Sequence, residues 1–341
     1  MGNTASEASA KLWQIISPFL DLNFKLHSRM HPMNNWLKGE TDQQIFIKRE
    51  DELSAGITGS KYRKFASLMP WIQSYQPDEV WIAGGNHSNH VVGLMQLLNE
   101  FNIPYRLWLL EDHQSHRTGN RLLLDLLMNN QASIEWIHRS DWPDLKRIIE
   151  AHQAEKRDQQ LLYIPEGGAM KEALPGLLTQ PLNLTKNLED WNIHVDHIFT
   201  DSGTGITSAA LLWGLGFLGY HQVHVHITLI AGDQSQFENQ LQQLKIAMIH
   251  LTGETLDVDL PVYSLHQPAT APSFGSINKT VLSALKSIAR EEGILMDPVY
   301  TVKHLLTVKN ILTNRATQGN AMILYNGGAL GMMGFQDRLW P

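Results

Sequence analysis

Short apolar runs alternate along the chain with longer stretches whose apolar residues recur every three or four positions. The runs typical of buried strands are 80–83, 105–110, 134–137, 161–164, 197–200, 224–230 and 321–325. The stretches with helical spacing are 91–101, 119–129, 209–218, 236–252 and 278–292. This alternation predicts parallel strands with helices on both faces of the sheet. Such sheets carry their chemistry in the loops after the carboxyl ends of the strands.

Length and composition limit what the chain can be. Its 341 residues suggest two domains at ~150 residues per domain, and no internal repeat or long linker is visible. Asp and Glu number 34 against 27 Lys and Arg, so the formal charge is −7 and a nucleic-acid partner is disfavoured. No stretch approaches the ~20 apolar residues of a membrane span. Because the chain has no cysteine, disulfides, thiol catalysis and thiolate metal sites are excluded.

The first six residues, MGNTAS, bear on where the protein resides. They lack the charged start and apolar run of a secretion signal, which predicts a soluble, cytoplasmic protein. They also fit the pattern for myristoylation at Gly2, although a start methionine followed by a small residue explains the same letters.

Four polar, glycine-rich loops follow predicted strands, namely 84–90, 165–169, 201–208 and 326–329. Residues 202–208 form the best predicted anion site, because Gly203 and Gly205 allow close backbone approach and a helix follows. Ser208 stands at the third glycine position of a dinucleotide fingerprint, and no acidic residue ends the next strand. The loop therefore predicts a lone phosphate ligand, with a capped turn that binds nothing as the alternative.

Histidines at short spacing raise the question of a metal. His87 and His90 are three residues apart, and His224 and His226 share one face of a predicted strand. Neither pair has a nearby carboxylate or further histidine at ligand spacing, so no metal site is predicted. Ser88 in the first of these loops is in a position typical of a helix N-cap.

Three cations lie close together at Lys61, Arg63 and Lys64. The simplest interpretation is a solvated helix face. However, Lys61 and Lys64 fall on the same side of a helix that starts near Ser60. Near a phosphate, one of these lysines could have the lowered pKa that an amine needs to form a Schiff base.

Six motifs in order make the chain resemble the D-cysteine desulfhydrase and 1-aminocyclopropane-1-carboxylate (ACC) deaminase family. They are residues 50–64, 84–90, 165–168, 203–207, 297–300 and 327–329. The resemblance implies a pyridoxal 5′-phosphate (PLP) enzyme with an α/β, tryptophan-synthase-β-like fold (fold type II). Each of two domains would have a largely parallel sheet flanked by helices. Residues 1–64 and 168–341 would form the large domain and 65–167 the small one, as a homodimer with PLP in the cleft.

The resemblance also assigns roles to individual residues. Lys61 would form the Schiff base with PLP and move the proton at the substrate Cα. Ser88 would bind the substrate carboxylate or transfer a proton. Tyr300 would stand close to the substrate. The other cofactor-binding residues would be Lys64 and the backbone of Gly203, Thr204, Gly205, Ile206 and Thr207 at the phosphate, Asn89 at the phenolic oxygen and Asn326 near the pyridine nitrogen.

The chain departs from the family pattern at several positions. Ser60 replaces an asparagine of the family pattern, and Asn326 replaces a threonine. Ile206 replaces a glycine, which could take a positive φ more easily than isoleucine can. Phe274 and Thr301 stand where ACC deaminases have a tyrosine and a glutamate. The sequence therefore favours β-elimination from a small D-amino acid, with D-cysteine giving pyruvate, sulfide and ammonia. The alternatives are ACC deamination and a non-catalytic protein that binds PLP or a phosphorylated metabolite.

Overall fold

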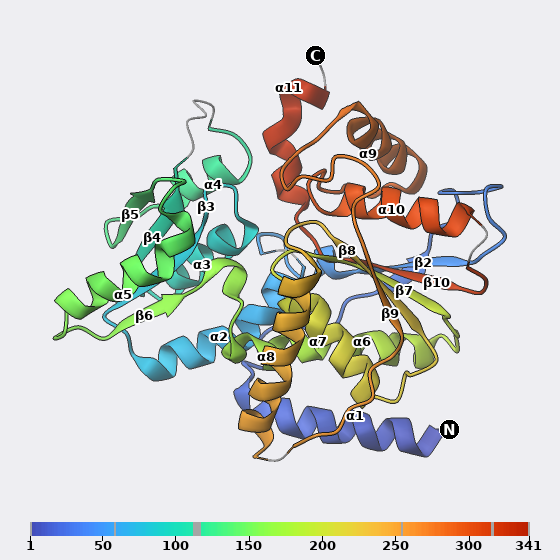
Figure 1. Ribbon diagram of the computed structural model, residues 1–341, viewed down its shortest axis with the longest axis horizontal. Helices are drawn as coiled ribbons and strands as arrows, with labels where there is room; N and C mark the ends of the chain where they lie inside the picture. The colour runs from blue at the N-terminus through green and yellow to red at the C-terminus, as the bar shows by residue number, and fades with distance from the viewer. Residues whose placement is uncertain (1, 58, 112–116, 254, 315–316, 340–341) are drawn as a thin grey trace.

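The computed structural model describes residues 2–57, 59–111, 117–253, 255–314 and 317–339, which form two separate sheets (Figure 1). The larger sheet has the strand order β1-β2-β10-β7-β8-β9. Its strands are β1 (Met30–Pro32), β2 (Ile45–Arg49), β7 (His197–Ser202), β8 (His224–Leu229), β9 (Tyr263–His266) and β10 (Ala321–Tyr325). Only the β1–β2 pair of this sheet is antiparallel.

The smaller sheet is entirely parallel and has the strand order β5-β4-β3-β6. Its strands are β3 (Glu79–Gly85), β4 (Tyr105–Leu110), β5 (Ala132–Ile137) and β6 (Leu161–Ile164). All four lie within residues 65–167, and every strand of the larger sheet lies outside this range. Two largely parallel sheets with flanking helices confirm the predicted fold class.

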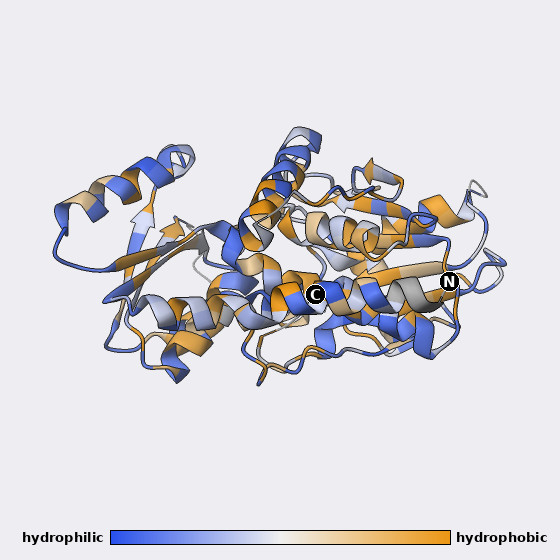
Figure 2. Cartoon of the chain, turned by 90° about the horizontal axis from the view of Figure 1, so that it is seen from below, coloured by the Kyte–Doolittle hydropathy of each residue, from blue (hydrophilic) through white to orange (hydrophobic). Residues whose placement is uncertain are grey.

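Eleven α-helices are found in the described residues. They are α1 (Gly2–Ile16), α2 (Ser60–Tyr75), α3 (Asn89–Glu100), α4 (Asn120–Leu127), α5 (Leu145–Glu155), α6 (Leu174–Asp190), α7 (Ile206–Phe217), α8 (Gln234–Thr252), α9 (Lys279–Glu292), α10 (Thr301–Thr313) and α11 (Gln336–Leu339). None of them is both long and apolar enough to span a lipid bilayer. In Figure 2 the helices carry hydrophilic and hydrophobic residues side by side, as expected for elements with one buried face.

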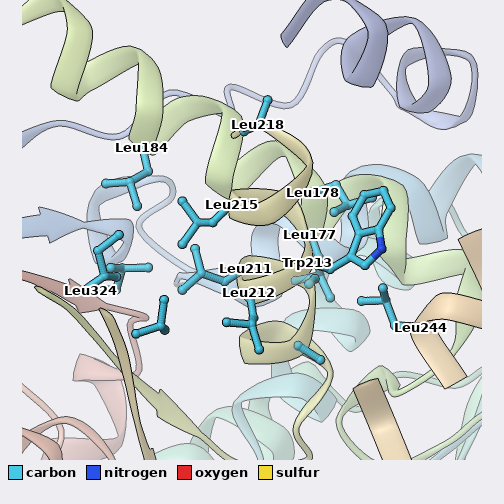
Figure 3. Close-up of a cluster of buried hydrophobic side chains, with 14 of the residues drawn as sticks. Leu177, Leu178, Leu184, Leu211, Leu212, Trp213, Leu215, Leu218, Leu244 and Leu324 are labelled. Atoms are coloured by element: carbon cyan, nitrogen blue, oxygen red, sulfur yellow. The ribbon is translucent and has the colours of Figure 1, made fainter. Parts of the chain in front are cut away.

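Helices cover both faces of the larger sheet, as the alternating pattern predicts. On one face, α6 and α7 bury a cluster that includes Leu178, Leu184 and Trp213 and extends to Leu244 of α8 (Figure 3). On the other face, α9 and α10 pack on a second apolar cluster. Two such faces allow each strand to be apolar on both sides, which explains the continuous apolar runs of the sequence.

All seven predicted strands and all five predicted helices are present, with small shifts at their ends. Three strands were missed. β1 and β9 are short, lie at the two edges of the sheet and are partly exposed, so their apolar signal is weak. β2 ends in Lys48 and Arg49, and the complete burial of Lys48 depends on partners elsewhere in the fold. Of the missed helices, α6 contains Pro175 and Pro181, which obscure helical spacing.

Candidate active site

The start of α2 places Lys61. The helix begins at Ser60 directly after Gly59, which has a positive φ of 66°. A Cβ on Gly59 would lie 1.6 Å from the backbone oxygen of Asn326, and the Ser60 N–H donates to that same oxygen at 3.2 Å. The carboxyl end of β10 therefore holds the first turn of α2. From there the Nζ of Lys61 lies 5.8 Å from the centre of the Tyr300 ring.

Lys64 occupies a buried position next to the loop after β6. Its Nζ donates to the Gly167 backbone oxygen at 2.7 Å. Burial, with the charge of Lys61 as a second cause, lowers the pKa of Lys64 to about 7. The lysine whose pKa is lowered is thus the one expected at the phosphate. A bound anion would supply the negative partner that this buried amine lacks.

The turn after β7 is a strand-to-helix connection of the kind that binds anions. Gly205 takes the positive φ, 93°, and α7 begins at Ile206. Ile206 is not among the residues with positive φ, so its replacement of a glycine causes no backbone strain. The first N–H groups of α7 have no acceptor within their own helix and are free to donate to a ligand. A Cβ on Gly167 would lie 2.7 Å from Thr204, which places this turn against the loop that Lys64 contacts.

The start of α3 brings the smaller sheet into the site. Ser88 is the N-cap of α3, and its Oγ accepts from the Val91 N–H at 3.3 Å. The Oδ1 of Asn89 accepts a hydrogen bond from the Asn120 side chain at 2.8 Å. Gly328 lies close on the other side, because a Cβ added to it would be 3.2 Å from the Nδ2 of Asn89. Asn89 therefore lies between the smaller sheet and the loop after β10.

Tyr300 covers the turn after β7. A Cβ on Gly203 would lie 3.3 Å from its ring, and Phe274 contacts the ring edge-on with centroids 5.6 Å apart. Burial and the nearby carboxylates of Asp297 and Asp201 raise the pKa of Tyr300 above its ordinary value. Its hydroxyl is therefore a proton donor at neutral pH.

The motif at 297–300 has a structural function as well. Asp297 accepts the backbone N–H groups of Val299, Tyr300 and Thr301, and so caps the start of α10. The hydroxyl of Thr301 donates to the same carboxylate at 2.8 Å. Thr301 is consequently tied to the helix cap and does not offer an acid to the site.

Asn326 is held on all sides by protein groups. Its amide donates to Thr200 at 3.0 Å and to Asp201 at 2.9 Å, and its oxygen accepts from Gln180 at 2.9 Å. Sequence reasoning missed Asp201, although an acid at the carboxyl end of a strand beside an anion-binding turn is a readable signal. The place of Asn326 beside the pyridine nitrogen stays a prediction.

The interpretation of the three cations as a solvated helix face is wrong for two of them. Arg63 and Lys64 are buried, and Arg63 forms a bidentate pair with buried Glu50, including an Nη2–Oε1 contact of 2.8 Å. Arg63 also donates to Thr179 of α6 at 2.9 Å. Buried Lys48 lies 3.9 Å from Glu50, and burial lowers its pKa to about 7. This network ties α2, and with it Lys61, to β2 and α6.

The residues that converge here fit PLP. The start of α2 presents two amines, the turn before α7 presents free N–H groups, and both ring nitrogens of buried His90 have no hydrogen-bond partner among the described residues. Burial, followed by the charges of Lys64 and Lys61, lowers the pKa of His90, so it is a neutral imidazole. A neutral donor and two amines in one place suit a ligand with anionic and phenolic oxygens.

Replacing Gly59 by alanine tests the link between β10 and α2. We expect Gly59→Ala to destabilise the fold by more than the ~1–3 kcal/mol that a positive φ costs a non-glycine residue, because the new Cβ also meets the Asn326 oxygen. The control is Gly293→Ala, at a similar φ of 68° with no atom within 4 Å. Urea unfolding of both variants measures the difference, and equal destabilisation would show that the contact is unimportant.

Known proteins match this chain over most of its length. No family model matches it. A Klebsiella pneumoniae protein named D-cysteine desulfhydrase is 27% identical over 313 residues, or 89% of this chain and 92% of the relative. A Thermotoga maritima protein, provisionally named a 1-aminocyclopropane-1-carboxylate deaminase, is 26% identical over 299 residues, or 86% of this chain and 92% of the relative.

Solved structures agree on the fold. The structure of an ACC deaminase homologue superposes with a TM-score of 0.80 at 22% identity, covering 96% of this chain and 98% of the other. A hydrogen sulfide-producing enzyme of Fusobacterium nucleatum superposes with a TM-score of 0.58 at 14% identity, covering 93% and 98%. The chain is therefore similar over most of its length to proteins named D-cysteine desulfhydrase and ACC deaminase, and it shares its fold with the solved ACC deaminase homologue.

Proposed function

We propose that the protein is a PLP-dependent lyase that eliminates the β-substituent of a small D-amino acid, converting D-cysteine to pyruvate, sulfide and ammonia. The observation that carries the proposal is the convergence of Lys61 with Tyr300 over the turn at Gly203. A flexible amine, a phenol and an anion-binding turn then lie within one small volume. These are the groups that such an elimination requires.

The binding of PLP uses groups already in place. Lys61 would hold the cofactor covalently through Nζ, while Lys64 and the N–H groups of Gly203–Thr207 would hold its phosphate. Asn89 would donate to the phenolic oxygen, since its Oδ1 already accepts from Asn120. Bound PLP supplies an electron sink that stabilises negative charge at the substrate Cα.

Proton transfer is assigned to the chain's own side chains. Lys61, once released as a free amine, would take the Cα proton, because its tether keeps it beside the substrate. Ser88 and the first N–H groups of α3 would bind the substrate carboxylate. Tyr300, kept protonated by its raised pKa, would donate a hydrogen bond to the leaving group.

The surroundings of Tyr300 favour elimination over ACC deamination. Phe274, which packs on Tyr300, has no hydroxyl, and the hydroxyl of Thr301 is engaged with Asp297. ACC has no Cα hydrogen, so opening its ring needs acids at other places than those an elimination uses. Neither of these two positions provides one.

The proposal also includes the expected organisation of the protein. Residues 1–64 and 168–341 would form the large domain and residues 65–167 the small domain, which agrees with the division of strands between the two sheets. The enzyme would act as a homodimer in the cytoplasm, with a small amino acid as its substrate.

A substrate panel tests the proposal. Purified enzyme with PLP is given D-cysteine, L-cysteine, D-serine or ACC, and pyruvate, 2-oxobutyrate and sulfide are measured. We expect pyruvate and sulfide from D-cysteine, at a rate at least ~10-fold above that from L-cysteine, because only one enantiomer presents its Cα hydrogen to Lys61. Formation of 2-oxobutyrate from ACC would instead identify an ACC deaminase, and PLP binding without any product would identify a binding protein.

A further inference from the structure

Three histidines gather at the amino ends of two neighbouring strands in the larger sheet. His197 begins β7, and His224 and His226 lie on β8, where His197 is directly opposite His224. One ligating nitrogen from each lies within 4.8 Å of the others. No motif spacing in the sequence joins His197 to His224 and His226, and only the pairing of β7 with β8 brings the three together. The group lies at the opposite end of these strands from the proposed active site.

Hydrogen bonds to protein groups orient the imidazole rings. The Nε2 of His197 lies 3.0 Å from the Gln318 backbone oxygen, which only accepts, so this nitrogen carries the proton and Nδ1 has a lone pair. That Nδ1 lies 3.1 Å from the Nε2 of His226. The Nε2 of His224 lies 2.8 Å from the Ser264 hydroxyl. Partners of this kind commonly orient histidines that bind metals.

His226 is the centre of the group. Its ring stacks on Phe199 with centroids 4.5 Å apart, and its Nδ1 lies 3.1 Å from the Nε2 of His266 on β9. With the Nδ1 of His197 as the acceptor, the Nε2 of His226 carries the proton of this hydrogen bond; a bound metal ion would take the place of that proton and select the other tautomer, in which the Nδ1 of His226 donates to His266. Metal ions bind the neutral form of imidazole.

We propose that His197, His224 and His226 bind one divalent transition-metal ion, with His266 as a positioning residue for His226. The group that these residues form contains no carboxylate. An all-imidazole donor set suits Zn²⁺, Co²⁺, Ni²⁺ or Cu²⁺, whereas Mg²⁺ and Ca²⁺ prefer oxygen. The facing nitrogens of His197 and His226 are 3.1 Å apart, close to the ~3.3 Å separation of nitrogens around tetrahedral Zn²⁺, and one nitrogen of His224 lies within 4.8 Å of both.

Zinc titration of the full-length protein tests the site. Calorimetry with ZnCl₂ on protein freed of metal by a chelator should show one ion per chain, and MgCl₂ should show none. His197→Gln, His224→Gln and His226→Gln should each weaken Zn²⁺ binding at least ~10-fold, since even the loss of a residue that orients a ligand costs about that much. His221→Gln, on an exposed histidine outside the group, should bind Zn²⁺ as the wild type does.

A spectroscopic measurement separates ligation from a structural effect of the substitutions. Co²⁺ added in place of Zn²⁺ should give the visible absorption of a nitrogen-ligated ion, and this absorption should be lost in His226→Gln and weakened in His266→Gln. Circular dichroism of the metal-free variants verifies that each is folded. Absence of Zn²⁺ binding in the wild type, or equal affinity in folded variants of all three ligands, would overturn the proposal. Because the active site is not involved, the outcome does not depend on whether D-cysteine is the substrate.

Discussion

Lys61→Ala is expected to abolish covalent PLP binding and to lower D-cysteine turnover by at least ~10³-fold, since a general base alone contributes ~10²–10⁴-fold. The expectation follows from the position of Lys61 at the start of α2, beside Tyr300 and one helical turn from Lys64. The absorbance near ~410 nm that is typical of a Schiff base should be present in the wild type and absent in the variant. Borohydride reduction followed by peptide mapping identifies the modified lysine.

Lys64→Ala is the matched control. Lys64 is buried and donates to the Gly167 backbone, so its loss should weaken PLP affinity while the absorbance near ~410 nm returns at high PLP concentration. The reverse result, with the absorbance lost in Lys64→Ala and kept in Lys61→Ala, would exchange the roles of the two lysines. Its low pKa of about 7 and its place one helical turn from Lys61 make Lys64 a competitor for the covalent role.

Arg63→Met is expected to reduce the free energy of unfolding by about 3–5 kcal/mol, the cost of removing one partner of a buried ion pair. Arg63 and Glu50 both have fully buried side chains, and the substitution would leave Lys48, at 3.9 Å, as the nearby cation of the Glu50 carboxylate. Urea unfolding measures the effect. The control is Arg29→Met: Arg29 pairs with Glu52 at 2.7 Å, but its side chain is 59% exposed, so its loss should cost about 0–1 kcal/mol.

The same pair makes stability depend on pH in a defined direction. Burial raises the pKa of Glu50, but the charge and hydrogen bonds of Arg63 outweigh burial and lower this pKa from 4.5 to about 2. Because the folded pKa lies below the unfolded one, the stabilisation is complete above pH 4.5 and is lost as the pH falls toward 2. In Arg63→Met the Glu50 pKa should rise, so the difference in free energy of unfolding between wild type and variant should shrink as the pH falls from 4.5 toward 2. A difference that stays constant over this pH range would contradict this role.

Local sequence pattern was sufficient for much of the framework. Apolar runs and helical spacing located seven strands and five of the helices, because burial on one or two faces of an element dictates the period of its apolar residues. Gly205 marked the predicted anion-binding turn after β7, since its positive φ of 93° favours a residue without a side chain. Order and spacing of motifs indicated the relatives, and the sequence comparisons confirmed them.

Other features depended on contacts between segments that are far apart along the chain. No local pattern shows that Arg63 is buried on Glu50, that the amide of Asn326 is held by Gln180 and Asp201, or which lysine has the lowered pKa. The histidine group forms because β7 and β8 pair in one particular register after a crossover helix, and β9 adds His266. The periodicity of apolar residues and the secondary-structure propensity of each residue act over a few positions of the chain. Burial, charge pairing and metal-ligand distances arise only when the strands and helices have packed together.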